Sequence, residues 1–252
     1  MKADYTRILE KLDNLFDRRE YAEAERLLRY WEKEGETSGD DKVYYLAVNE
    51  QMGLYRKLGR EQDALAAVRK MLNYLDRTNR RMSVEGATAL LNAGTVYKVF
   101  GKSEEGLSFF DEACFVYEEL LRPDDKRLAG LYNNMSSALA DTGRLNDALG
   151  MCKKALDILS KRGDSEAEEA ITYLNMTGIY EKRDGLENAQ DEIERCLTAA
   201  QKKLDMAASQ SDGNYAFVCE KCAPTFGYYG WFLEKEELMR RAREIYERLG
   251  AV

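Results

Sequence analysis

The chain has 252 residues, of which 38 are basic and 46 acidic, so its net charge is −8 at neutral pH. Nucleic acids and anionic membrane surfaces carry charge of the same sign, and we expect neither as a partner. Histidine, the commonest general base and metal ligand, is absent, which argues against an enzyme. Five cysteines, an odd number, favour a reducing compartment over a disulfide framework.

The composition also bears on location and on secondary structure. No segment approaches the roughly 18 apolar residues that span a bilayer, and the first five residues lack the apolar core of a signal peptide. We therefore expect a cytoplasmic protein. A hydrophobic content of 44% with only two prolines favours helices over strands.

A unit of two helices returns along most of the chain. Glycines recur at an interval of 42 residues: Gly59, Gly101 and Gly143. Asn92 and Asn134 have the same separation, and Asn175 follows 41 residues later. Self-similarity at such a period predicts a solenoid in which supersecondary units stack on one another.

Apolar side chains three and four residues apart predict amphipathic helices in chain order. We expect six helix pairs, at approximately residues 3–34, 41–77, 83–121, 126–161, 165–208 and 214–249 of one solenoid covering residues 1–252. Between the first two pairs, the segment from Gly35 to Asp40 is rich in turn formers. We predict a loop there that serves as a hinge.

Local signals mark later boundaries. Pro123 ends the third pair, because proline cannot continue the hydrogen-bond ladder of a helix. Ser165 and Glu168 have the spacing of a capping box and predict the start of the fifth pair. Pro224 lies inside the sixth pair, where it predicts a kink or an interruption. We expect this divergent pair to be a cap, because terminal repeats shield an exposed core.

The third pair carries the clearest copy of the repeated motif. A glycine and a tyrosine three residues apart are followed by a small residue, an aromatic residue and an alanine: Gly94, Tyr97, Gly106, Phe110 and Ala113. This pattern resembles the tetratricopeptide repeat (TPR). Its long period is similar to that of kinesin light chain and of the Rap and PlcR-type peptide receptors of Gram-positive bacteria. The resemblance implies an all-α fold, a right-handed α-α superhelix of about six helix pairs, and a module that binds proteins or peptides.

In a TPR array the first helix of each pair lines the concave side. In each pair we expect the residues two before, one after, and four to five after the position equivalent to Gly94 to face that groove. Three successive pairs place an asparagine at one such position, and a fourth asparagine lies beside the second: Asn92, Asn134, Asn175 and Asn133. Asparagines at this slot bind the main chain of a peptide in the resembling proteins, which implies the same role here. An amide suits this role because it both donates and accepts hydrogen bonds. The alternative is that these amides bond neighbouring helices or water.

Further candidate peptide-binding residues are three cations and one tyrosine. Arg56, Lys98 and Lys182 occupy other groove positions and would favour a ligand with acidic groups; the alternative is a solvated helix face. Tyr228 belongs to the aromatic run at residues 226–232, most of which we expect to pack in the core. A kink at Pro224 would instead turn Tyr228 toward the groove as a binding anchor.

Two other functions compete with peptide binding. One is a structural scaffold that oligomerises or docks a folded partner through its convex face. The remote one is a metal or redox protein that uses the CxxC formed by Cys219 and Cys222. Zinc normally takes four ligands, and neither histidine nor a second CxxC completes the set. Both cysteines fall in apolar slots, so we expect core packing, with no metal and no cofactor.

Overall fold

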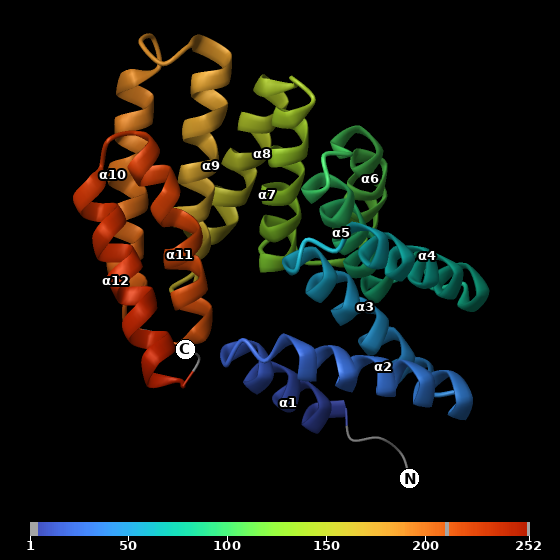
Figure 1. Ribbon diagram of the computed structural model, residues 1–252. Coiled ribbons are helices and arrows are strands. Elements are labelled where there is room, and N and C mark those ends of the chain that lie inside the picture. Colours follow the sequence, from blue (N-terminus) through green and yellow to red (C-terminus); the bar gives the residue numbers. More distant parts are fainter. Residues whose placement is uncertain (1–4, 210–211, 251–252) are drawn as a thin grey trace. The chain divides into compact units, whose positions relative to one another are not determined.

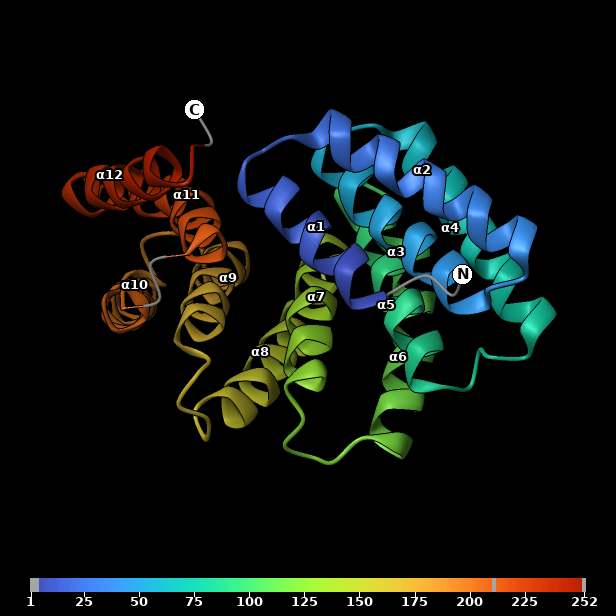
Figure 2. The same ribbon diagram turned by 90° about the horizontal axis from the view of Figure 1, so that it is seen from below.

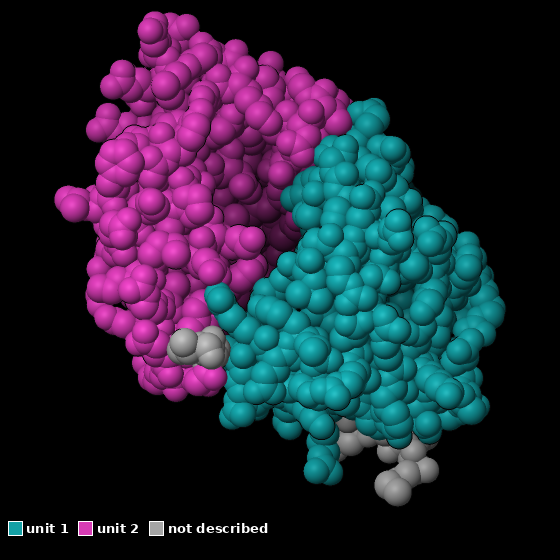
Figure 3. Space-filling model, viewed as in Figure 1, with its two compact units in different colours: residues 1–120 teal, residues 121–252 magenta. Residues whose placement is uncertain are grey.

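The computed structural model describes residues 5–209 and 212–250. Within these residues the chain forms twelve α-helices and no strand (Figure 1), which confirms the predicted all-α class. The helices group into two compact units, Met1–Leu120 and Leu121–Val252, coloured separately in Figure 3. The right-handed coiling of a single solenoid stays a prediction.

Each unit contains three pairs of helices. Unit 1 holds α1 (Tyr5–Asp17), α2 (Tyr21–Ser38), α3 (Asp41–Lys57), α4 (Glu61–Thr78), α5 (Val84–Val99) and α6 (Ser103–Leu120). Unit 2 holds α7 (Lys126–Asp141), α8 (Leu145–Leu159), α9 (Glu166–Asp184), α10 (Gln190–Ala207), α11 (Gly213–Tyr228) and α12 (Phe232–Arg248). In unit 2 the first helices α7, α9 and α11 form one layer, and α8, α10 and α12 form the other (Figure 2). Within the first layer, α9 packs against both α7 and α11.

Glycines make the turns within the last five pairs. Five of them have φ between 68° and 83°: Gly59, Gly101, Gly143, Gly185 and Gly230. This left-handed backbone strains any residue that carries a Cβ, so glycine is favoured where a helix must end and the chain reverse. The 42-residue recurrence of glycine in the sequence therefore reports the positions of these turns.

The motif residues of the third pair bring α5 and α6 into close contact. A Cβ on Gly106 would lie 2.9 Å from the carbonyl oxygen of Gly94. A Cβ on Gly94 would lie 2.8 Å from the ring of Phe110, which is completely buried. The two glycines are thus required by the small separation of the helices, and the phenyl ring fills the space beside them.

The predicted hinge between the first two pairs is wrong. Helix α2 continues through this stretch to Ser38, and only Gly39 and Asp40 connect it to α3. A Cβ on Gly35 would meet the backbone nitrogen of Tyr44 at 2.6 Å, so this glycine permits close packing of α2 on α3. The hydroxyl of Ser38 donates to the carbonyl of Glu34 within the helix, at 2.6 Å. These residues, which often form turns, here belong to a helix and allow it to pack closely on the next one.

Two further local predictions are met only in part. Helix α9 begins at Glu166, directly after Ser165 as expected, and a kink at Pro224 stays a prediction. The hydroxyl of Ser165 donates to the carboxylate of Asp164 at 3.2 Å and makes no capping bond to α9. Helix α11 runs without interruption through Pro224. The proline side chain is exposed, while Cys222, Ala223 and Phe226 around it are buried in the core of unit 2. This packing holds the helix together across the missing hydrogen bond.

The start of α7 offers a test of capping and its pH dependence. Asp125 accepts a hydrogen bond from the backbone N–H of Arg127 at 3.0 Å and pairs with its guanidinium at 2.7 Å. The Arg127 side chain lowers the pKa of Asp125 to about 2. Asp125→Ala should therefore lower the free energy of unfolding by about 1 kcal/mol at pH 7.

The lowered pKa fixes how this difference varies with pH. Because the folded pKa lies below the unfolded value of about 3.9, the contribution is present above about pH 4 and is lost as the pH falls toward about 2. Urea unfolding at pH 7, 5 and 3 measures it. Asp124→Ala, at the exposed neighbouring carboxylate, is the control and should change stability little. A difference that stays constant down to pH 3 would contradict the assignment.

Candidate peptide-binding face

The first-helix layer of unit 2 carries a set of residues, mostly polar or aromatic, none of which is fully buried. We call it the α7/α9/α11 face and define it by Asn134, Ser137, Asp141, Asn175, Gly178, Glu181, Lys182, Phe217, Lys221 and Tyr228. Spacings of three and four residues place the members from one helix on one side of it. Contacts between side chains of the face, described below, join α7 to α9 and α9 to α11.

Asn175 lies near the middle of α9 and is half-buried. Its amide makes no hydrogen bond within the part of the chain that the structure describes. An amide carries two donor hydrogens and an acceptor oxygen, and these are costly to leave unpaired when water is partly excluded. Asn175 is therefore the predicted residue most available to a ligand.

Tyr228 and Tyr229 of α11 both bind the carboxylate of Glu181 on α9. Each hydroxyl donates to a different carboxylate oxygen, and both distances are 2.7 Å. The hydrogen bond and the negative charge of Glu181 raise the pKa of Tyr228, while burial is the main cause that raises the pKa of Tyr229. The Tyr228 residue is 69% exposed, so its ring is fixed at its hydroxyl end and open to solvent over most of its surface.

The asparagines of α7 have other partners. The amide of Asn134 donates to the carbonyl of Gly130 in its own helix at 2.9 Å. Asn133 donates to the hydroxyl of Thr172 on α9 at 2.7 Å, and its side-chain oxygen is buried with no hydrogen-bond partner among the described residues. Asn133 thus connects two helices of the layer. Lys182 and Asp141 connect the same two helices farther along, with 3.7 Å between nitrogen and oxygen.

The corresponding residues of unit 1 form a hydrogen-bonded chain. The amide of Asn92 on α5 donates to Asn49 on α3 at 2.9 Å, and Asn49 donates to Glu50 at 3.2 Å. Burial raises the pKa of Glu50 and lowers that of Arg56. Arg56 is half-buried and forms no ion pair with any described residue, but the negative charge of Glu50 acts on it and raises its pKa against the effect of burial. Lys98 is also half-buried on α5.

One residue expected to face the groove does not. Thr95 on α5 is buried, and its hydroxyl donates to the carbonyl of Leu91 in the same helix at 2.8 Å. A threonine can satisfy its hydroxyl in this way and pack its methyl group in the layer. The equivalent Gly53 and Ser137 remain half-buried.

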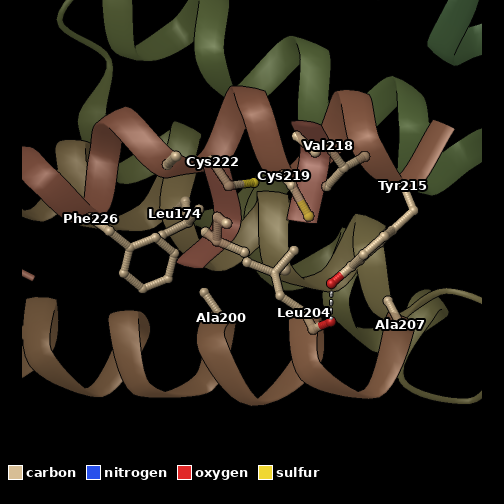
Figure 4. Packing of buried hydrophobic residues seen from close by; sticks show 14 of the residues in the cluster. Leu174, Ala200, Leu204, Ala207, Tyr215, Val218, Cys219, Cys222 and Phe226 are labelled. Atoms are coloured by element: carbon tan, nitrogen blue, oxygen red, sulfur yellow. Dashed lines mark hydrogen bonds between the residues drawn. The ribbon is translucent and has the colours of Figure 1, made fainter. Parts of the chain in front are cut away.

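The cysteines of the CxxC pack in the core of unit 2. Cys219 and Cys222 lie among Leu174, Val218 and Phe226, with their sulfur atoms inside the cluster (Figure 4). Burial raises the pKa of both thiols, that of Cys222 to about 12, so they stay protonated at neutral pH. This confirms the packing interpretation. The described residues also contain no group of three or more acidic or sulfur side chains arranged to hold a metal ion.

The structure shows two features that sequence reasoning missed. In unit 1 a cavity of about 990 Å³ lies between α1, α2 and the start of α3, over Ile8, Leu27 and Trp31. Sequence periodicity does not report how far two helices diverge. In unit 2 the ammonium of Lys221 lies 5.5 Å from the centre of the Phe217 ring. The four-residue spacing of Phe217 and Lys221 on one helix could have predicted this contact.

Comparison with known proteins identifies the repeat. Residues 128–162, which cover α7 and α8, match the family model "Tetratricopeptide repeat". This segment of the chain is a tetratricopeptide repeat. A curated relative, "Protein KINESIN LIGHT CHAIN-RELATED 3" of Arabidopsis thaliana, is 28% identical over 113 residues. This match covers 44% of the TPR chain and only 17% of the relative.

Solved structures share the fold at low identity. A Rap protein complexed with Competence and Sporulation Factor has a TM-score of 0.57 at 14% identity, covering 97% of the TPR chain and 74% of its own. BtubC (BKLC) from P. vanneervenii has a TM-score of 0.55 at 15% identity, with coverages of 93% and 92%. A putative kinesin light chain from Podosopora anserina has a TM-score of 0.51 at 12% identity, with coverages of 80% and 94%. These similarities establish the TPR fold alone.

Two coarse conclusions follow for the TPR chain. Repeats of this kind are generally protein-interaction modules, which agrees with the coarse prediction of a binding protein. None of the helices in the described residues is long and apolar enough to cross a membrane.

Proposed function

We propose that this TPR protein binds an extended peptide, or an extended segment of a partner protein, along the α7/α9/α11 face. It does so as a binding module without catalysis. Asn134 and Asn175 bind the main chain of the ligand, and Tyr228 contacts one of its side chains. The observation that carries the proposal is the half-buried amide of Asn175, which has no hydrogen-bond partner among the described residues.

The energetics of hydrogen bonding support this role. The amide of Asn175 is half-buried and still reaches water, so a peptide that bonds to it replaces water, and such a hydrogen bond contributes roughly 0.5–1.5 kcal/mol net. The main chain of an extended peptide offers an N–H and a C=O at regular intervals, which match the two ends of an amide. Asn175 is thus placed to accept one bond from the peptide and donate another.

The similarity of fold to the Rap protein complexed with Competence and Sporulation Factor supports the same mode of action. We extend the proposal to the charge of the ligand. Lys182, on the α7/α9/α11 face, contacts its nearest carboxylate only at 3.7 Å. This cation favours a peptide that carries acidic groups. For a ligand bound to unit 1, Arg56 and Lys98 have the same preference.

The test begins with a peptide obtained without knowledge of the natural ligand. The purified chain is immobilised, and binders are selected from a display library of random peptides about twelve residues long. A selected peptide, labelled with fluorescein, then reports the Kd by fluorescence polarisation. Asn134→Ala combined with Asn175→Ala should raise this Kd at least tenfold and leave helicity and Tm nearly unchanged.

A matched pair of asparagines on the second helices provides the control. Asn73 on α4 and Asn146 on α8 are both exposed, and Asn73→Ala combined with Asn146→Ala should leave the Kd within about twofold of the wild type. If the selected peptide still binds the Asn134/Asn175 variant, the face is wrongly assigned. If selection yields no peptide that binds the wild type, peptide binding itself is refuted.

A further inference from the structure

Gly178 occupies the interior of α9 without any internal reason for a glycine. A Cβ built on it would have no atom within 4 Å, in contrast to Gly94 and Gly106, where a Cβ would clash. Glycine weakens a helix interior relative to alanine, because it loses more backbone freedom on folding. Packing within the chain therefore does not account for Gly178.

The surroundings of Gly178 point to an external occupant. Asn175 lies one turn before it on the same side of α9, with an amide that makes no hydrogen bond to the described residues. Glu181 lies one turn after it and fixes Tyr228 by a hydrogen bond of 2.7 Å. The bare backbone of Gly178 thus lies between an unpaired amide and an exposed aromatic ring.

We propose that the main chain of the bound peptide crosses α9 directly over Gly178, between the Asn175 amide and the Tyr228 ring. This inference rests on the proposed function and assigns the place of closest approach. A missing Cβ allows another backbone to come near enough for the Asn175 amide to reach it. The Tyr228 ring then receives the following apolar side chain of the peptide on its face, because a rigid aromatic ring gives contact area at little entropic cost.

Gly178→Ala is the decisive variant, because stability and binding should change in opposite directions. Alanine favours the helix and has space, so the Tm should rise by about 2–4 °C. The added methyl group displaces the peptide, so the Kd of the selected labelled peptide should rise at least tenfold. A gain in Tm together with a loss of affinity excludes unfolding as the cause.

Gly150 on α8 provides a matched control. It also lies in a helix interior, and a Cβ there would likewise have no atom within 4 Å, but it belongs to the second-helix layer of the same unit. Gly150→Ala should raise the Tm by a similar amount and keep the Kd within about twofold. For the ring, Tyr228→Ala should raise the Kd at least fivefold, and Tyr228→Phe, which keeps the ring but loses its bond to Glu181, should raise it about two- to threefold.

Each contrary outcome has a distinct meaning. If Gly178→Ala binds the peptide like the wild type while the Asn134/Asn175 variant does not, the crossing point is wrong and the proposed function stands. If Gly178→Ala lowers the Tm, the space over the glycine is not open, and the inference is also wrong. If no selected peptide binds the wild type, the proposed function and this inference are both refuted.

Discussion

Glu169→Ala is expected to lower the free energy of unfolding by about 3 kcal/mol, at the lower end of the range for breaking a buried ion pair. Glu169 on α9 is 2% exposed, and its carboxylate accepts a hydrogen bond from the ammonium of Lys203 on α10 at 2.7 Å. Truncation leaves the ammonium beside a cavity and without its partner. The Lys203 side chain is partly exposed and can turn toward water, which limits the loss.

Urea unfolding followed by circular dichroism measures this loss, and neighbouring variants identify its cause. Glu168→Ala, at the exposed preceding residue, should change stability by less than about 0.5 kcal/mol. Lys203→Met should destabilise at least as much as Glu169→Ala, because it leaves a buried carboxylate unpaired. Adding Glu169→Leu to that variant should restore most of the stability. A loss below about 1 kcal/mol for Glu169→Ala would show that the pair is not buried in solution.

Phe110→Ala is expected to cost about 3–5 kcal/mol in unit 1, which is typical when a buried phenyl ring is replaced by a cavity. The ring is 0% exposed and lies against Gly94 at the crossing of α5 and α6. Thermal and urea unfolding measure the loss. Phe115→Ala on the same helix, where the ring is mostly exposed, is the control and should cost far less.

A double-mutant cycle tests whether Phe110 and Gly94 act together. Gly94→Ala in the wild type should cost about 1–3 kcal/mol, because the new Cβ would lie 2.8 Å from the phenyl ring. In a Phe110→Leu background the same change should cost less, since the smaller side chain makes room. Part of the cost should remain, because the carbonyl oxygen of Gly106 would lie 3.0 Å from the Cβ. Strict additivity of the two changes would contradict this packing.

The sequence determined the repeat and its turns. The spacing of Gly59, Gly101 and Gly143 located three left-handed turns, because few residues other than glycine adopt that backbone without strain. The Gly94 and Phe110 motif identified a close helix crossing for the same kind of local steric reason. The apolar positions of Cys219 and Cys222 in the periodic pattern also predicted their burial correctly.

The tertiary structure decided which turn-forming residues pack inside helices and which polar residues bond to a neighbouring helix. Gly35 reads as a loop residue but permits close packing on Tyr44, and Pro224 remains helical because its neighbours are buried. The asparagines look equivalent in sequence, yet Asn92 bonds Asn49, Asn134 bonds the carbonyl of Gly130, and Asn175 alone of these three makes no bond among the described residues. Periodicity reports which way a side chain points along its own helix. Whether a partner lies there depends on the neighbouring helix, which only the packed layers bring into place.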